Sequence, residues 1–280
     1  MIKVGYLGPE GTFSEEAGKV YAKKLEGKVE MIPYATFHDL LTDANRNKVD
    51  EAVVPIENSI EGTVPAVTDI LAQENNLKIK QEIVVAVHQY LVAGKGVKLS
   101  EITDVISHPQ PLGQCTEYLR KNLPKAKLHL SHSTVEAIKQ VATSISEKGI
   151  VFAAIGSKAA ANLYKLKIIA SSVNAKGNET RFLVLAKNDH AKTGHDKSSI
   201  VFSVAKNRPG GLYSILGEFA DRKINLTKIE SRPSKKALGD YFFFVDLDGH
   251  RDDALVSEAL KNVKKNVAFF KFLGSYPKHK

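Results

Sequence analysis

The order of hydrophobic and polar positions divides the chain into short apolar runs and stretches with the 3.6-residue period of helices. The first apolar runs predict buried strands at residues 3–7, 30–34 and 51–55. Thr12 and Glu15 form a capping box before the first helix, a second helix is expected at 37–45, and Thr63 is the expected N-cap of a third. This order, βαβαβα, predicts a parallel sheet with helices on both faces.

A longer strand with loose alternation is expected at residues 79–93, ended by Gly94 and Gly96. A second series of strands is then expected at residues 104–107, 127–130, 150–155, 168–171 and 182–186. Helices are expected at 112–122 and after Ser133, which forms a capping box with Glu136. The pattern therefore predicts two α/β lobes joined by crossing strands, and the cleft between such lobes is a common site for a small ligand.

The pattern changes at residues 188–199, which are polar, lack large apolar side chains and are typical of a linker. Beyond them, strands are expected at 200–204, 225–231, 240–246 and 267–273, with helices at 212–222 and 252–265. The resulting order, βαββαβ, predicts a ferredoxin-like domain. The predicted fold class is α/β, with a two-lobed domain at residues 1–187 and an α+β ferredoxin-like domain at residues 200–280.

The composition is that of an ordinary soluble globular protein, with 43% of the 280 residues hydrophobic and 25% charged. A single cysteine, Cys115, rules out an internal disulfide framework and fits a reducing compartment. The N-terminal apolar run is too short for a signal peptide, and no apolar run approaches the ~18 residues of a membrane span. We therefore expect a cytoplasmic protein without membrane contact.

The formal net charge of +9 could indicate a nucleic-acid-binding protein, but the lysines are dispersed along predicted helices. No helix-turn-helix, zinc-ligand cluster or aromatic RNA-binding signature accompanies them. We expect no nucleic-acid partner and interpret the charge as a solvated surface whose field attracts small anions. The nine histidines form no metal-ligand spacing, so no metal is expected.

The first candidate for a functional site is the stretch of residues 178–182. Within it, Thr180, Arg181 and Phe182 present a hydroxyl, a guanidinium group and an aromatic ring where a predicted loop enters a strand. The planar donors of arginine match the two oxygens of a ligand carboxylate. The alternative is an ordinary strand edge with a solvated arginine and a core phenylalanine, and the local pattern leaves both interpretations open.

Three polar loops that each follow a predicted strand supply further candidates. The first loop enters a helix, whose N-terminus suits an anion, and all three lie where ligands bind in open α/β sheets. The candidates are Gly11 and Thr12 in the first loop, Glu57, Asn58 and Ser59 in the second, and His108 and Gln114 in and after the third. Each loop could also be structural only, as a capped turn, a polar surface turn or a turn with a structural histidine.

The C-terminal domain has two further motifs. A glycine-containing turn, residues 209–212, precedes a helix and allows close approach of a ligand or a facing chain. A predicted strand begins at Asn225 and Leu226 and ends at residues 230–233 with two charges and a hydroxyl. A tight turn and a plain hairpin end are the alternatives.

Together these motifs resemble prephenate dehydratase in its single-function form with a C-terminal ACT regulatory domain. The matching stretches are residues 8–13, 54–59, 107–111, 114–115, 180–182 and 230–233. Each stretch is weak alone, but six in the family's order over nearly the whole chain are specific. Because the chain starts at the catalytic domain, we expect no chorismate mutase domain of the kind fused to some relatives.

The resemblance implies conversion of prephenate to phenylpyruvate, water and carbon dioxide in phenylalanine biosynthesis, in the cleft of a domain of the periplasmic-binding-protein type. The catalytic residues that it implies are Thr180, Asn58, Ser59 and Gln114. The substrate-binding residues that it implies are Gly11, Thr12, Glu57, Arg181, Phe182 and His108. Thr180 would assist departure of the ring hydroxyl. Because that loss aromatises the ring, no redox cofactor or metal is expected.

In the ACT domains of this family, a Pro-Gly-Ala-Leu turn and a Glu-Ser-Arg-Pro motif form a phenylalanine site at a subunit interface. The allosteric residues implied here are Pro209, Gly210, Gly211, Leu212, Asn225, Leu226, Glu230, Ser231, Arg232 and Pro233. Gly211 stands where the family has alanine, which leaves the strength of feedback open. The expected assembly is a homodimer or homotetramer that phenylalanine regulates.

Two alternatives remain at this point. Arogenate dehydratase uses the same fold on the aminated substrate, and one sequence does not separate the two enzymes. A non-catalytic small-molecule sensor would have the same domain types, but it would have no use for the hydroxyl of Thr180.

Overall fold

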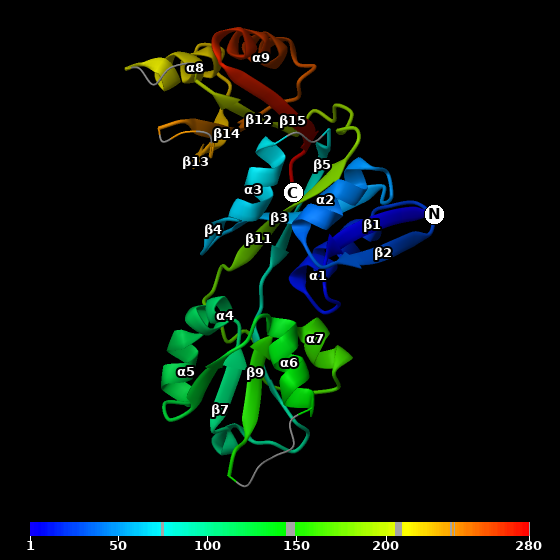
Figure 1. Cartoon of the computed structure of the whole chain (residues 1–280), viewed down its shortest axis with the longest axis vertical. Coiled ribbons are helices and arrows are strands. Elements are labelled where there is room, and N and C mark those ends of the chain that lie inside the picture. Colours follow the sequence, from blue (N-terminus) through cyan, green and yellow to red (C-terminus); the bar gives the residue numbers. More distant parts are fainter. Residues whose placement is uncertain (74–75, 144–148, 205–208, 236, 238, 280) are drawn as a thin grey trace.

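The computed structural model describes the chain except residues 74–75, 144–148, 205–208, 236, 238 and 280. Three bodies lie along its longest axis: two α/β lobes and, beyond the first lobe, the C-terminal domain (Figure 1). We call them lobe 1, lobe 2 and the ACT domain. The two-lobed α/β unit and the ferredoxin-like domain expected from the sequence are both present.

Lobe 1 contains a mixed sheet. Its strand order is β2 (Val29–Tyr34), β1 (Ile2–Leu7), β3 (Glu51–Asn58), β11 (Glu179–Ala186) and β5 (Lys78–Ala86), with β4 (Gly62–Thr63) paired to β3. Its helices are α1 (Phe13–Ala22), α2 (Phe37–Asn45) and α3 (Pro65–Ala72). The β1–β2 and β1–β3 pairs are parallel, whereas β11 is antiparallel to β3 and β5. The three strands expected to be parallel are so, but the sheet as a whole is mixed, because β11, whose strand at 182–186 was expected in the second series, returns from lobe 2 and lies between β3 and β5.

Lobe 2 contains the second sheet, β10 (Lys167–Ala170), β6 (Tyr90–Ala93), β9 (Phe152–Gly156), β7 (Asp104–Ser107) and β8 (Lys127–Leu130). Its helical elements are a 3-10 turn, Leu99–Glu101, and α4 (Pro109–Gln114), α5 (Thr116–Asn122), α6 (Thr134–Thr143) and α7 (Lys158–Leu163). The single strand expected at 79–93 is in fact β5 and β6, which belong to different lobes. Cys115 lies buried between α4 and α5, in the core of lobe 2.

The chain crosses between the lobes twice, at residues 87–89 and 171–178. The two crossings run beside each other. Val87 donates its backbone N–H to the Asn178 carbonyl at 2.7 Å, and Val173 donates to the Gln89 carbonyl at 2.9 Å. Because backbone hydrogen bonds join the crossings, they form a two-stranded hinge rather than two loose linkers.

The ACT domain is a four-stranded sheet with the order β13 (Leu226–Pro233), β14 (Tyr241–Asp248), β12 (Asp196–Ser203) and β15 (Phe269–Pro277). Helices α8 (Gly211–Ala220) and α9 (Ala254–Asn266) supply the apolar side chains that form a core with this sheet. Strand β12 begins at Asp196, inside the segment expected to be a linker. The reason is local: the Asp196 carboxylate accepts hydrogen bonds from Thr193 and Gly194 and so fixes this polar turn.

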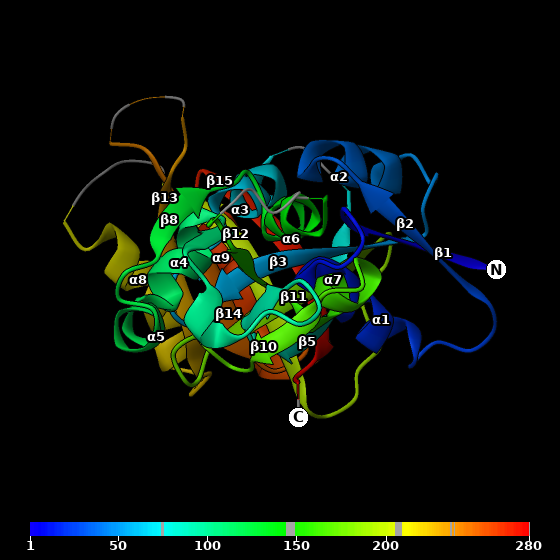
Figure 2. The same ribbon diagram turned by 90° about the horizontal axis from the view of Figure 1, so that it is seen from below.

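Lobe 1 and the ACT domain share one apolar core. Val201, Leu273 and Tyr276 of the ACT domain belong to the same buried cluster as Leu183 and Leu185 of β11. The backbones come so close that a Cβ on Gly274 would lie 2.4 Å from the Ile79 carbonyl oxygen. Seen from the lobe 2 end, α1, α2 and β2 extend to one side of the molecule and α8 to the other (Figure 2).

Two details of the helices bear on the predictions. The N-cap of α3 is Val64, without a side-chain hydrogen bond, so the expected cap at Thr63 is wrong. Thr63 instead pairs with Glu57 in the β3–β4 ladder and donates its hydroxyl to Glu230 of the ACT domain. In the described part of the chain, no helix is both long enough and apolar enough to cross a bilayer.

Candidate active site

A cavity of about 380 Å³ lies between the two lobes, with the hinge along one side. Lobe 1 contributes the ends of β1 and β3 and the start of β11, and lobe 2 contributes the loops before α4 and α6. The lining residues are Leu7, Thr12, Phe13, Ser14, Pro55, Asn58, Val64, Val87, Gln89, His108, Gln110, Pro111, Gln114, His132, Ser133, Thr134, Thr180 and Phe182. Both lobes and the hinge are therefore needed to form it.

Strand β11 presents Thr180 and Phe182 to this cavity. Side chains alternate along a strand, so residues 180 and 182 lie on one face of the sheet and residue 181 on the other. Phe182 is only 1% exposed and packs in the apolar core beneath α1. Most of its ring therefore serves the core, and only part of it forms the cavity wall.

The side-chain amide of Asn58 fixes the hydroxyl of Thr180. Its Nδ2 donates to Thr180 Oγ1 at 2.9 Å and to Asn178 Oδ1 at 2.7 Å. Its Oδ1 accepts from the backbone N–H groups of Ile60 and Glu61, each at 3.0 Å. Asn58 is 8% exposed, so it is a buried and fully used polar group that holds Thr180 in one position.

The same network joins the two lobes. Asn178, which is 4% exposed, donates Nδ2 to Gln114 Oε1 at 2.9 Å, and Gln114 lies at the end of α4 in lobe 2. Asn178 was part of the motif expected from the sequence, but its bridging role was not foreseen. Gln114 and Asn58 thus hydrogen-bond to protein partners and hold the cavity wall together.

Three helix N-termini are directed at the cavity. Thr12, whose hydroxyl accepts from the Glu15 N–H, caps α1, and His108 caps α4 through Nδ1. Ser133 accepts from the Glu136 N–H at the start of α6. The described lining residues include no Lys, Arg, Asp or Glu. The field that an anion meets in the cavity therefore comes from N–H groups and helix dipoles rather than from a cationic side chain.

Arg181 does not line the cavity, and the expected direct contact with substrate is contradicted by its position. It lies on the opposite face of β11, where its guanidinium donates to Glu82 Oε2 at 2.7 Å, Asp246 Oδ2 at 2.6 Å and the Tyr276 hydroxyl at 2.8 Å. Asp246 and Tyr276 belong to the ACT domain. The strand alternation that brings Thr180 to the cavity turns Arg181 away from it.

Glu57 is likewise absent from the cavity wall. It neighbours the buried Asn58, and its carboxylate lies 3.1 Å from Lys228 Nζ and 3.9 Å from Arg181 Nη1. The reason is again alternation along a strand, here β3, where residues 57 and 58 lie on opposite faces. The expectation that Glu57 binds substrate directly is therefore wrong.

Gly11 and Ser59 are not among the described residues that line the cavity, but they support the segments that do. The Gly11 carbonyl accepts from Ser157 of lobe 2, and a Cβ on Gly11 would lie 2.9 Å from Ala160 of α7. Only glycine permits this contact between the lobes, and its φ of +89° also favours glycine. Ser59 accepts from the Glu179 N–H and donates to the Gly177 carbonyl, so it secures the strand that carries Thr180.

Several lining residues were not predicted from the sequence: Gln89, Gln110, His132, Ser133 and Thr134. A signal for residues 132–134 was available, because they follow the parallel strand β8 as His108 follows β7. Gln89 carried no such signal, because it was expected inside one long strand and actually lies in the hinge.

In the ACT domain, the side chains of Glu230 and Arg232 contact lobe 1. Glu230 accepts from Thr63, and Arg232 Nη2 lies 3.2 Å from Asp69 Oδ1 in α3. The burial of β13 alternates along its whole length, so residues 231 and 233 are exposed on the other side. Of these expected allosteric residues, Glu230 and Arg232 therefore lie at the interface with lobe 1, whereas Ser231 and Pro233 are exposed.

The expected allosteric residues also lie at two ends of the ACT sheet. Strands β12 and β13 are both antiparallel to β14, so they run in the same direction. The turn at Gly210, which has a φ of +77°, follows the end of β12 and lies at the same end as Pro233. Asn225 and Leu226 are at the opposite end, about 25 Å away along the strand. One small ligand cannot reach both ends within one chain.

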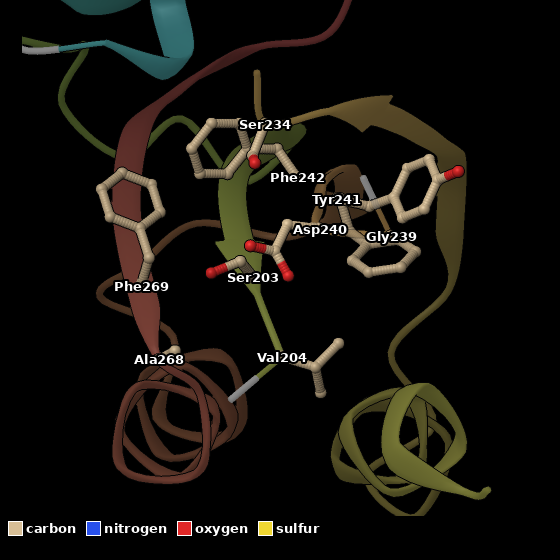
Figure 3. A pocket seen from close by; sticks show the side chains of 10 residues that line it. Ser203, Val204, Ser234, Gly239, Asp240, Tyr241, Phe242, Ala268 and Phe269 are labelled. Carbon is tan, nitrogen blue, oxygen red and sulfur yellow. The ribbon is translucent and has the colours of Figure 1, made fainter. Parts of the chain in front are cut away.

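A second, smaller cavity of about 190 Å³ lies at the β13–β14 hairpin end of the ACT domain (Figure 3). Phe242 and Phe269, with ring centres 5.1 Å apart, form its apolar side, and Ser203 and Asp240 place oxygen atoms in it. None of the ten expected allosteric residues is among its described lining residues.

Across the described chain, no group of three or more His, Cys, Asp or Glu side chains could hold a metal ion.

Two family models match separate parts of the chain. A family model described as prephenate dehydratase matches residues 4–190, and an ACT domain model matches residues 198–265. The prephenate dehydratase of Methanocaldococcus jannaschii is 40% identical over 276 residues, which cover 97% of each chain. A bifunctional chorismate mutase/prephenate dehydratase of Aquifex aeolicus is 41% identical over 99% of this chain and 74% of its own.

A solved structure is also similar over the whole length. The crystal structure of prephenate dehydratase from Arthrobacter aurescens in complex with L-Phe has a TM-score of 0.88 and 33% identity, and the match covers 99% of this chain and 90% of that one. The two lobes, the inter-lobe cavity and the ACT domain thus define a lyase-type enzyme with a regulatory domain. The chain belongs to the prephenate dehydratase family.

Proposed function

We propose that this protein converts prephenate to phenylpyruvate, water and carbon dioxide in the cavity between its lobes. The observation that carries the proposal is the position of Thr180, whose hydroxyl lines the cavity while Asn58 fixes its oxygen at 2.9 Å. Thr180, Asn58 and Gln114 lie in stretches that resemble the family's motifs, and the chain is 40% identical to a named prephenate dehydratase.

The charge pattern of the cavity suits this substrate. Prephenate carries two carboxylates and a ring hydroxyl, and the three helix N-termini offer N–H groups to anions. Since Arg181 and Glu57 lie outside the cavity, we assign substrate binding to the N-termini at Thr12, His108 and residues 133–134. Loss of the hydroxyl together with carbon dioxide makes the ring aromatic, so the main task of the protein is alignment and placement of charge.

Thr180 acts on the leaving hydroxyl as a hydrogen-bond donor. Its oxygen accepts the N–H of Asn58, which leaves the hydroxyl proton to be directed into the cavity. Donation by Asn58 polarises the Thr180 hydroxyl, and the donor is already in place before the substrate binds. Ser59 and Gln114 contribute indirectly, by holding β11 and α4 in position.

We further propose that the ACT domain at residues 200–280 binds phenylalanine and regulates the catalytic domain at residues 1–187. A relative of 33% identity was crystallised with L-Phe. Because the expected allosteric residues lie at opposite ends of one ACT sheet, a complete site needs a second subunit that brings the other end alongside. A homodimer or homotetramer follows from this requirement.

The test is turnover by the purified, chelator-treated protein. Prephenate should yield phenylpyruvate, and arogenate in a parallel reaction should react more slowly. Preference for arogenate would assign the sister enzyme, and no turnover of either compound would favour a binding-only sensor. Adding phenylalanine up to about millimolar concentration should change both activity and hydrodynamic size, and no change in either would contradict the regulatory proposal.

A further inference from the structure

The cavity contains one buried amide that the protein leaves without a partner. Apart from the exposed Gln110, three amide side chains line the cavity: Asn58, Gln89 and Gln114. Asn58 hydrogen-bonds through both ends of its amide, and Gln114 bonds to Asn178 and Glu61. Gln89 is 3% exposed, its Oε1 is buried without a partner, and no described residue bonds to its amide.

The backbone of Gln89 is fixed in the hinge. Its N–H donates to Asn174 Oδ1 at 2.8 Å, and its carbonyl accepts from the Val173 N–H at 2.9 Å. The residue lies between β5 of lobe 1 and β6 of lobe 2, so its side chain reaches the cavity from the segment that joins them. The absence of a side-chain partner is therefore not the result of a frayed or solvent-exposed segment.

Burial of an amide without hydrogen bonds is unfavourable, and most buried polar groups in folded proteins have partners. The two amides with partners in the same wall show that this cavity follows the rule. A ligand in the cavity can supply what Gln89 lacks. A half-turn about its last side-chain bond exchanges the NH2 group and the oxygen, so the amide can direct either one at the ligand.

We propose that Gln89 binds the substrate, donating an N–H to a carboxylate or keto oxygen of prephenate. This assignment rests on the proposed function. At neutral pH the substrate offers five acceptor oxygens in its carboxylates and keto group, whereas its one donor is the ring hydroxyl, the group to which Thr180 donates. Because acceptor oxygens outnumber donors in the substrate, we expect the N–H end of the amide to face it, and the described lining residues include no Lys or Arg that could take its place.

Steady-state kinetics of Gln89→Met test the assignment. Methionine keeps the length and the apolar bulk but removes the amide, so KM for prephenate should rise about 10- to 100-fold, as expected for a lost hydrogen bond to a charged group. The kcat should stay within about threefold, because Thr180 and Asn58 are untouched. The free variant should melt at the same temperature as the wild type or higher, since an unpaired buried amide has been removed.

A raised KM together with an unchanged or raised melting temperature distinguishes a binding role of Gln89 from a structural one. Loss of a structural hydrogen bond would lower the melting temperature. Gln89→Glu keeps the shape but offers only acceptors and a negative charge, so it should raise KM at least as much. Gln89→Asn, which keeps the amide but withdraws it by one methylene group, should also raise KM. Gln140→Met, on the exposed face of α6, is the matched control and should leave KM unchanged.

Two results would overturn the assignment. A KM within about twofold of wild type in Gln89→Met and Gln89→Asn would show that the amide does not bind substrate. A normal KM in Gln89→Glu would show that it does not donate. Lack of turnover by the wild-type enzyme would instead refute the proposed function, and this outcome is seen before any variant is made.

Discussion

The two faces of strand β11 have different surroundings. One face presents Thr180 and Phe182 to a cavity with a neutral wall. The other face presents Arg181 to Glu82, Asp246 and Tyr276, which are 4%, 8% and 0% exposed. Three consecutive residues thus divide between the inter-lobe cavity and a buried ionic network.

The difference shows how one strand can serve both chemistry and domain attachment. On the cavity face a single hydroxyl is held in place and left able to donate. On the other face the network continues through Lys197, Ser199 and the backbone N–H of His279, so residues from β12, β14 and the C-terminal segment meet at this face of β11. A change on one face should affect the reaction, and a change on the other should affect stability.

The largest effect on stability is expected on the ionic face, the face of β11 on which Arg181 contacts Glu82 and Asp246. Arg181→Met should lower the free energy of unfolding by about 3–5 kcal/mol, because the buried Asp246 loses its cation and Glu82 keeps only Lys197. Arg181→Lys keeps the charge but loses the planar donors, so its loss should be smaller, about 1–3 kcal/mol. Urea denaturation measures both values. If folded Arg181→Lys showed a large rise in KM for prephenate with unchanged stability, the arginine would be a substrate ligand after all.

On the cavity face, Thr180→Ala should lower kcat by about 10²- to 10³-fold, the effect of losing one preorganised donor. The free energy of unfolding should change by no more than about 1.5 kcal/mol, because one hydrogen bond with Asn58 is lost. Thr180→Ser keeps the hydroxyl and serves as the control. If Thr180→Ala retained wild-type kcat, the leaving-group role would have to be assigned elsewhere in the cavity.

The smallest effect is the pH dependence of the ionic face. Desolvation alone would raise the pKa of Glu82 and of Asp246, but Arg181 reverses this effect and holds both pKa values below their usual range. A lowered pKa in the folded state stabilises the protein above the unfolded-state pKa, so this stability is lost as the pH falls through the folded-state value.

The wild type should therefore lose stability between about pH 5 and about pH 3, where carboxylates of the unfolded chain take up protons. In Arg181→Met the main cause of the lowered pKa is gone, so the gap in unfolding free energy between the two proteins should narrow over the same range. Denaturation at several pH values measures the gap. A gap independent of pH would show that Arg181 does not act on these carboxylates by its charge.

The sequence predicted the elements of the molecule well where the pattern was local. The caps at Thr12 and Ser133 are present, and strands at 104–107 and 127–130 have the predicted bounds. The prediction failed where pairing was not local. Residues 79–93 read as one strand with loose alternation, and no local signal marks the point at which the chain leaves one sheet and enters another.

The site shows the same division. Motif spacing located Thr180, Asn58, Gln114 and His108, all of which line the cavity. It also selected Arg181 and Glu57, which adjoin cavity residues along the chain but lie on the opposite faces of their strands. A motif groups residues that are neighbours in sequence, whereas contact with a ligand depends on which face of the sheet each side chain occupies.

The sequence by itself determined the two-lobed and ferredoxin-like domain types, the family and the segment that carries Thr180, because periodicity, capping and motif order are properties of the chain. Only the tertiary structure decided which side chains share the cavity, that Arg181 ties β11 to the ACT domain, and that the side-chain amide of Gln89 has no partner among the described residues. These features depend on strands more than a hundred residues apart coming together, as Asn58 does with Asn178. Burial and hydrogen-bond satisfaction exist only after that pairing is complete.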